Sequence, residues 1–426
     1  MPALPLWPLY AMFGMVPLWW ALGGLYLFWP AFTVVLGVVL LSRGRLRMPT
    51  GWSLWLMLIG LMVVSATQME KLVGFFMYGL RLSFVVSAFL VYLYVYNAAR
   101  NGTSWKKLFQ PLMVFWLSVV LLGWLGVLMP RFSLNTPVAM LLPEGISGER
   151  MVQALTHVHA TEFSATSRNP YYRTAAPFPY TNNWGTAFAI LVPCVVAYLS
   201  SVREGLLRKI VIGSLPLSLV PAFLTLNRGM FVGLGAGLLY LGLRALMRGD
   251  VRVIASILGV ALLGWVVTLF VPVMDLITNR VENTQSTRDR ADLYWQTLHA
   301  VLHSPLLGYG APRSVDTTTG AEPLGTQGQL WLIMFSHGLP ALIIFLLIFV
   351  LAARRLSVAV SAAGKWLSII PIITLTLTPF YGYSDPNMSV MFFGIGLAMA
   401  AVDGPVNRAA TQGRPVRPPA RAAIQG

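Results

Sequence analysis

The placement of charged residues constrains this chain more than any other feature. Of its 426 residues, 57% are hydrophobic and only 10% are charged, so about a dozen apolar runs alternate with short polar connections. When the connections are divided alternately into two sets, one set contains 19 Lys or Arg and 3 Asp or Glu. The other set contains 10 Lys or Arg and 11 Asp or Glu. An excess of basic residues on one side of a bilayer marks the cytoplasm. The sequence therefore predicts a polytopic membrane protein whose basic connections are cytoplasmic.

The bulk composition excludes several classes of protein. A net charge of +16 would suggest a nucleic-acid partner in a soluble protein, but here it is concentrated in turns that set membrane orientation. We therefore expect no nucleic-acid binding. The single cysteine, Cys194, lies in an apolar run and permits neither an intramolecular disulfide nor a cysteine-based metal site. The apolar N-terminus has no charged region or cleavage signal ahead of further runs, so we expect a retained first span.

The apolar runs are long enough for about twelve transmembrane helices. A helix needs about 20 apolar residues to cross a hydrocarbon core of roughly 30 Å. The uncharged stretch 6–41 could supply two spans, broken near Gly23–Gly24. We expect an all-α transmembrane domain over 1–402 with both termini cytoplasmic, followed by a disordered tail over 403–426, rich in Pro, Arg and Ala. The remaining expected spans are 51–67, 73–97, 108–129, 184–200, 210–227, 230–247, 253–274, 329–353, 366–383 and 386–402.

Two connections, 130–183 and 275–328, are far longer than ordinary turns, and loops of that size are usually functional. Both fall on the side opposite the basic connections, so we expect them to be periplasmic. In the first loop, Met151, Leu155 and Val158 have the spacing of an amphipathic surface helix, and 168–185 reads as irregular chain returning to the bilayer. In the second loop, Ser286 or Thr287 is expected to cap a helix that runs to about His303.

Three segments on that side of the membrane could carry chemistry. The first is Leu226-Asn-Arg-Gly229, between two spans. The second runs from Arg288-Asp-Arg-Ala-Asp-Leu-Tyr-Trp295 to His303-Ser-Pro-Leu-Leu-Gly-Tyr-Gly310. The third is Ser336-His-Gly-Leu-Pro340, which places His337 about one turn beneath the outer boundary of its span, at a Gly-Pro weak point.

In combination these blocks resemble the superfamily of O-antigen ligases and O-antigen polymerases, over residues of about 180–345. The two long loops and the absence of an added soluble domain look most like the ligase branch, the WaaL ligases. The resemblance implies a GT-C-like glycosyltransferase fold in the bacterial inner membrane. It also implies transfer of a polysaccharide from undecaprenyl diphosphate to lipid A–core on the periplasmic face, with no cofactor.

The candidate residues suit that chemistry. Breaking the sugar–phosphate bond builds negative charge on the diphosphate, and arginine can bind phosphate oxygens in a bidentate fork. Arg288 and Arg228 are the first candidates for this role and Arg290 the next. The acceptor hydroxyl must lose a proton, and neutral His337 would be the base. Further candidates are Arg81, inside a span, and Asn227, Trp295 and Tyr309.

Each assignment has a structural alternative. His337 could be a packing histidine, Arg288 could pair with Asp292 along a helix, and Arg228 could extend to the membrane surface as a helix-end residue. A metal at His157 and His159 is disfavoured, because residues i and i+2 do not share a helix face and no carboxylate set completes a site. We expect no metal.

Three other functions stay open. The chain could be an O-antigen polymerase, whose acceptor is a second lipid-linked glycan. It could be a protein O-oligosaccharyltransferase, although such enzymes often carry a further periplasmic domain. It could also be a transporter of lipid-linked glycans, although transporters often show internal repeats and broken helices at the membrane midplane.

Overall fold

The structure is a computed structural model that describes residues 4–44, 46–69, 72–143, 148, 150–164, 171–268, 285–313 and 323–404. The N-terminal half contains these helices: α1 (Trp7–Leu9), the π-helix η1 (Tyr10–Gly14), α2 (Val16–Ala21), α3 (Leu25–Leu41), α4 (Trp52–Ser65), the 3-10 turn η2 (Ala66–Gln68), α5 (Leu72–Arg100), α6 (Trp105–Leu128), α7 (Pro137–Leu141) and α9 (Arg150–Thr156). The C-terminal half contains α10 (Thr181–Ser201), α11 (Leu206–Leu224), α12 (Arg228–Met247), α13 (Val251–Thr268), α15 (Gln285–His303), α16 (Gln329–Leu356), α17 (Ala362–Leu367), α18 (Ile370–Leu377) and α19 (Asp385–Val402).

Seven of the described helices are long and apolar enough to cross a membrane, and they make this a polytopic membrane protein; they are α5, α6, α10, α11, α12, α16 and α19. Four of the five other expected spans correspond to the shorter apolar stretches 25–41, 52–68, 251–262 and 362–377. The expected break near Gly23–Gly24 is confirmed, because α2 ends at Ala21 and α3 begins at Leu25. A count of twelve spans stays a prediction.

Two expected spans are not continuous helices. The run from residue 6 is divided into α1, η1 and α2. The prediction of a single helix over 366–383 is wrong. This segment is divided between α17 and α18, and it is no longer helical after Leu377. Pro8 and Pro371 each stand at the first or second position of a helix, where a missing N–H costs no helical hydrogen bond. Apolar composition therefore predicted where the apolar segments lie, but not whether each one is a continuous helix.

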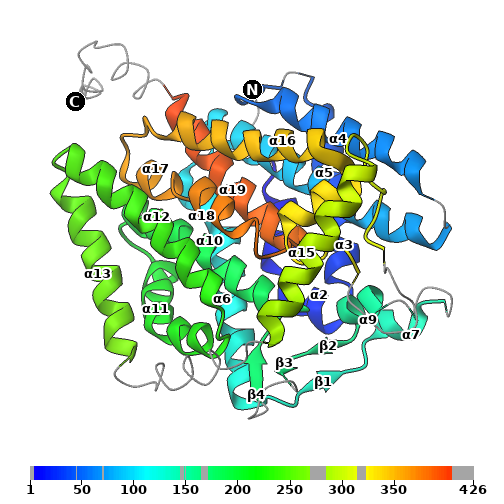
Figure 1. Ribbon diagram of the computed structural model, residues 1–426. Coiled ribbons are helices and arrows are strands. Elements are labelled where there is room, and N and C mark those ends of the chain that lie inside the picture. The colour runs from blue at the N-terminus through cyan, green and yellow to red at the C-terminus, as the bar shows by residue number, and fades with distance from the viewer. Residues whose placement is uncertain are drawn as a thin grey trace, which may run out of the picture.

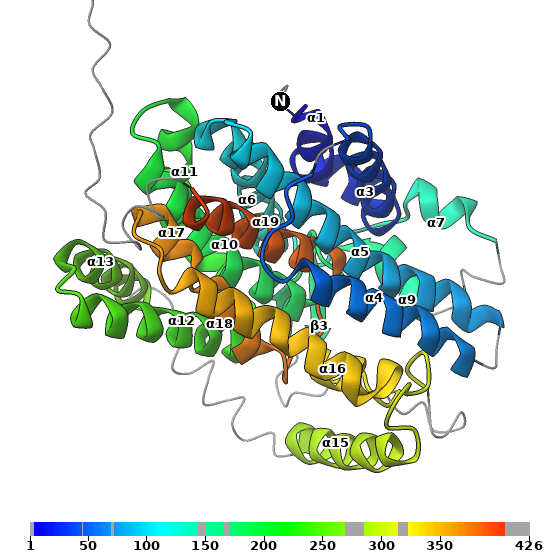
Figure 2. The ribbon, with the colours of Figure 1, turned by 90° about the horizontal axis from the view of Figure 1, so that it is seen from above.

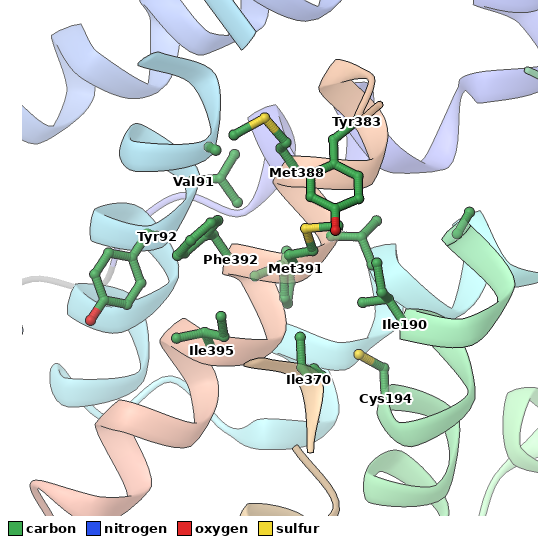
Figure 3. Packing of buried hydrophobic residues seen from close by; sticks show 14 of the residues in the cluster. Val91, Tyr92, Ile190, Cys194, Ile370, Tyr383, Met388, Met391, Phe392 and Ile395 are labelled. Atoms are coloured by element: carbon green, nitrogen blue, oxygen red, sulfur yellow. The ribbon is translucent and has the colours of Figure 1, made fainter. Parts of the chain in front are cut away.

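The centre of the bundle is α19, which lies between α5 and α10 (Figures 1 and 2). Almost every α19 side chain is buried, as expected for a helix that is apolar on all faces. Figure 3 shows the side chains of α19 packed against those of α5, α10 and α18. The residues in this contact are Val91, Tyr92, Ile190, Cys194, Ile370, Met388, Met391, Phe392 and Ile395. This core holds α5 and the loop before α19 in place, and both contribute to the site described below.

The fold is helical as expected, and the first long loop adds a small amount of β-structure to it. The loop contains two small antiparallel sheets, with β1 (Ser133–Leu134) pairing β2 (Val158–His159) and β3 (Thr161–Ser164) pairing β4 (Tyr171–Thr174). They gather at one end of the molecule (Figure 1). The amphipathic helix is shorter than its hydrophobic spacing predicted. α9 ends at Thr156, and Val158 pairs with Leu134 in a sheet. The expected irregular return is also partly wrong, since its residues 171–174 form β4.

The second long loop contains the expected helix. α15 ends at His303 as expected, but it begins at Gln285, so Ser286 and Thr287 lie inside it and neither is its N-cap. α6 ends at Leu128, α10 begins at Thr181 and α16 begins at Gln329. The expected start of the second loop at 275 lies outside the described residues, and the limits of the two loops stay predictions. The expected disordered tail lies outside the described residues after Gly404.

Candidate functional site

A break in α16 is the local feature on which the site is built. Gly338 has non-helical angles, φ 84° and ψ 174°, within the span, which confirms the weak point expected there. Leu339 donates its N–H to the carbonyl of Pro305 at 2.8 Å instead of to Phe335, and Pro340 has no N–H for Ser336. The helix therefore leaves two carbonyls, those of Phe335 and Ser336, without their usual intrahelical partners.

The segment Pro305–Gly310 supplies those partners. Tyr309 donates its N–H to the Phe335 carbonyl at 2.9 Å, and Gly310 donates to the Ser336 carbonyl at 2.8 Å. Buried backbone groups in a membrane protein must be satisfied internally, so this pairing makes the break stable. Two glycines allow the close approach: a Cβ on Gly308 would lie 2.4 Å from the Phe335 oxygen, and one on Gly338 would lie 2.2 Å from the Leu306 oxygen. We call this backbone pairing of 305–310 with 335–339 the joint.

His337 lies in the joint and is 3% exposed. Its Nδ1 is 2.6 Å from Ser65 Oγ, at the end of α4, and its ring meets Tyr78 edge-on with centroids 6.2 Å apart. The Ser65 hydroxyl donates its one hydrogen to the Met62 carbonyl at 2.6 Å. Nδ1 is therefore the donor to Ser65 Oγ, and Nε2 retains its lone pair. In the neutral imidazole this arrangement leaves Nε2 as the hydrogen-bond acceptor.

His337 lines a cavity of ≈ 950 Å³ that is bordered by several segments. The walls come from α4, α5, the first half of α16 and the loops around residues 180, 311, 325 and 382. Apolar side chains include Met62, Met69, Met77 and Met388, and among the described residues the charged ones are Arg81, Glu162 and Arg313. This described part of the cavity thus combines an imidazole, two guanidinium groups and one carboxylate with a flexible apolar wall.

Arg81 and Arg313 reach the cavity from different elements. Arg81 lies in the middle of α5 and is half-buried. Arg313 follows the joint, donates from Nη2 to the Gln68 carbonyl at 2.8 Å, and stands over the ring of Tyr309 at 5.1 Å. Tyr309 stacks in turn on Phe335, with ring centroids 4.8 Å apart. The joint that sets His337 therefore also fixes Tyr309 and Arg313 along the same wall.

Glu162 is held at the end of a helix. Its Oε2 accepts a hydrogen bond from the backbone N–H of Thr181 at 3.0 Å, where α10 begins. A carboxylate is stabilised by the positive end of the helix dipole at this position. Glu162 therefore contributes fixed negative charge to the cavity rim.

Several residues expected at the site have other environments. Asn227 is 1% exposed and caps α12, since its Oδ1 accepts from Met230 N at 3.0 Å. Trp295 is 63% exposed and packs edge-on against His299, outside the cavity lining. Arg228 is exposed at the first position of α12 and does not line the cavity itself. Its neighbour Gly229 donates to the hydroxyl of Tyr381 at 3.0 Å, and Tyr381 does line the cavity.

The two other expected arginines, Arg288 and Arg290, lie in the first turns of α15. Their side chains are outside what the structure describes, so their assignment to the diphosphate stays a prediction. The helix that carries them packs on α16 through Tyr294, which stacks on Trp331 with centroids 4.4 Å apart. α15 also leads through His303 directly into the joint.

Two residues of the site, Ser65 beside His337 and Arg313 in the cavity wall, were not found from the sequence. Ser65 stands among apolar neighbours near the end of an expected span, and nothing in its local pattern distinguishes it from a packing serine. Arg313 lies three residues beyond Gly310, so the Pro-Leu-Leu-Gly-Tyr-Gly block pointed to its region but not to its side chain. Among the residues that the structure describes, no group of three or more His, Cys, Asp or Glu could hold a metal ion.

The segment that contains the joint has a recognisable family pattern. Residues 212–346 match the O-antigen ligase family, Wzy_C. The Wzy_C match includes Arg228, Arg288, the joint and His337, and leaves out Ser65 and Arg81. It spans less than half of the chain, and no curated protein matches the sequence. The similarity to Wzy_C therefore concerns the segment that carries the histidine and its supporting loop.

Proposed function

We propose that this protein is an O-antigen ligase. It transfers O-antigen polysaccharide from undecaprenyl diphosphate to a sugar hydroxyl of lipid A–core, on the periplasmic face of the bacterial inner membrane. The observation that carries the proposal is His337, held by Ser65 with Nε2 as an acceptor in a cavity that two arginines share. The match of residues 212–346 to the O-antigen ligase family supports the same reaction.

His337 is the general base of the proposed reaction. Nε2 takes the proton of the acceptor hydroxyl as its oxygen attacks the anomeric carbon. The bond from that carbon to the phosphate oxygen breaks, and undecaprenyl diphosphate leaves with the electron pair. A single displacement of this kind inverts the anomeric centre. The Nδ1 contact with Ser65 prepares the imidazole by fixing the tautomer that has its lone pair on Nε2.

Arginine residues stabilise the leaving diphosphate. Arg81 and Arg313 supply guanidinium groups in the cavity, and Arg288, Arg290 and Arg228 lie on elements joined to its walls. Fixed positive groups directed at developing charge usually give the largest catalytic contribution. No metal takes part, because guanidinium groups occupy the role that a divalent cation would have at a diphosphate.

The test is transfer by the purified protein. Undecaprenyl-linked glycan is supplied with lipid A–core, with a second lipid-linked glycan, or with an acceptor peptide, so that ligase, polymerase and protein transferase activities are separated. His337→Ala should reduce ligation by about 10²–10⁴-fold, the usual cost of losing a general base. His303→Ala, at an exposed position of α15, is the matched control and should retain activity. Near-normal ligation by His337→Ala at equal protein level would reject the proposal.

A further inference from the structure

The described part of α15 has three different faces. Leu293, Thr297 and Val301 form the inward face, on which Thr297 and Val301 are buried. A second, exposed set consists of Asp292, Gln296, His299 and His303. At about 100° per residue, spacings of three and four keep each set on one side of the helix. A third set, Trp295, Leu298 and Leu302, is apolar and is 63%, 40% and 65% exposed.

A helix with one packed, one polar and one exposed apolar face fits a boundary between protein, water and lipid. An amphipathic helix at a bilayer surface buries its apolar side in the acyl region and keeps its polar side in water, and tryptophan favours that interface. In water, by contrast, an exposed apolar stripe of this kind would be costly and would promote association. The side-chain pattern of α15 therefore specifies a lipid neighbour on its third face.

The apolar stripe of α15 continues onto a transmembrane helix. Leu306, 68% exposed, extends the stripe beyond the helix end, and the Pro305 carbonyl accepts a hydrogen bond from Leu339 of α16. From Leu339 the exposed apolar residues Ile343, Leu347 and Val350 run along the span. Figure 2 shows α15 lying beside the first half of α16. One continuous apolar surface thus leads from the lipid-facing side of α16 onto α15.

We infer that α15 is an interfacial helix whose Trp295–Leu298–Leu302–Leu306 stripe contacts the acyl chains of the bilayer. The loop helix is therefore partly immersed in the leaflet and does not project freely into water. The border between the lipid-facing and water-facing sides of α15 is the headgroup layer, where a lipid-linked diphosphate would lie under the proposed function. The inference about α15 itself does not depend on the transfer reaction.

Spin labelling of the full-length protein in nanodiscs of phosphatidylethanolamine and phosphatidylglycerol tests this inference. Single cysteines replace Leu298 or Leu302 on the apolar stripe, Gln296 or His303 on the polar face, and Ile343 as a reference on α16. The native Cys194 is buried and can be replaced by alanine. Nitroxide relaxation is then measured with oxygen, which partitions into lipid, and with a neutral nickel chelate, which stays in water.

The expected result is a several-fold higher ratio of oxygen to nickel accessibility at 298, 302 and 343 than at 296 and 303. Two stripe positions are used so that poor folding of one variant does not decide the outcome. Nickel accessibility at 298 and 302 equal to that at 296 and 303 would show that the stripe faces water and would overturn the inference. Shielding of 298 and 302 from both reagents would show that protein, including a second copy of this chain, covers the stripe, and would also overturn it.

Discussion

At the scale of single residues, the chemistry of His337 depends on its partner. An imidazole in an apolar span could hold its hydrogen on either nitrogen, and only the tautomer with its hydrogen on Nδ1 leaves a lone pair on Nε2. Ser65 decides between them because its own hydrogen is directed to the Met62 carbonyl. Ser65 is therefore a positioning residue, and its loss should weaken the reaction without abolishing it.

Ser65→Ala should reduce transfer by up to about tenfold, corresponding to one hydrogen bond of about 0.5–1.5 kcal/mol. Ser65→Thr keeps the hydroxyl and should restore most of the rate, which a purely steric role would not predict. The measurement is single-turnover transfer at matched protein level. A defect in Ser65→Ala as large as that of His337→Ala would mean that Ser65 has a further role.

Arg288→Lys should give a severe loss of transfer, because lysine keeps the charge but not the planar fork that binds two phosphate oxygens. Arg228→Ala should also impair transfer and cause lipid-linked donor to accumulate in cells. Arg252→Lys, at an exposed position of α13, is a matched control and should be near normal. Equal activity of Arg288→Lys and the unaltered protein would remove Arg288 from the diphosphate site.

At the scale of elements, the joint is the feature that connects the second long loop to the membrane domain. It replaces two intrahelical hydrogen bonds of α16 with two bonds from Tyr309 and Gly310. The same contact seats Tyr309 and Arg313 along the cavity wall. Any change that opens the joint should therefore displace His337 and the wall together.

Gly308→Ala and Gly338→Ala should each reduce both stability and transfer. Both glycines have positive φ, which costs an alanine about 1–2 kcal/mol, and the new Cβ would meet a backbone carbonyl that cannot move freely. Gly235→Ala on α12 is the matched control, because a Cβ at Gly235 would have no neighbouring atom within 4 Å. Thermal unfolding in detergent and the transfer assay would be measured in parallel. Unchanged values for both joint variants would show that the contact is not required.

At the scale of the whole molecule, the cavity is assembled from segments that are far apart in the chain. It combines residues of α4, α5 and α16 with four separate loops, around a core in which α19 is enclosed by its neighbours. The distribution of basic residues predicts that the side with the two long loops is periplasmic.

Cysteine labelling in intact cells should modify positions 150 and 316, in the two long loops, from outside. Position 358, in the basic connection after α16, should react only after permeabilisation. The native Cys194 is buried and gives little background. Labelling of 150 or 316 only after permeabilisation would reverse the predicted orientation and remove the periplasmic reaction.

Transfer should continue at its full rate in excess chelator, because the proposed reaction stabilises the diphosphate with guanidinium groups. The comparison is between chelator-treated protein and the same protein with added magnesium or manganese. Loss of activity on chelation and its recovery with either ion would contradict the metal-free mechanism.

The membrane character, most helix limits, the end of α15 at His303 and the break beside His337 could be predicted from the sequence. These features follow from local composition, from periodicity and from the backbone restrictions of glycine and proline. Which side chains meet could be learned from the folded structure alone. Ser65 and His337 are 272 residues apart, and Arg81 and Arg313 share a cavity although neither stands in a pattern that refers to the other. These contacts depend on packing between elements that are distant in the chain, whereas the Asn227 cap of α12 is a local contact with Met230.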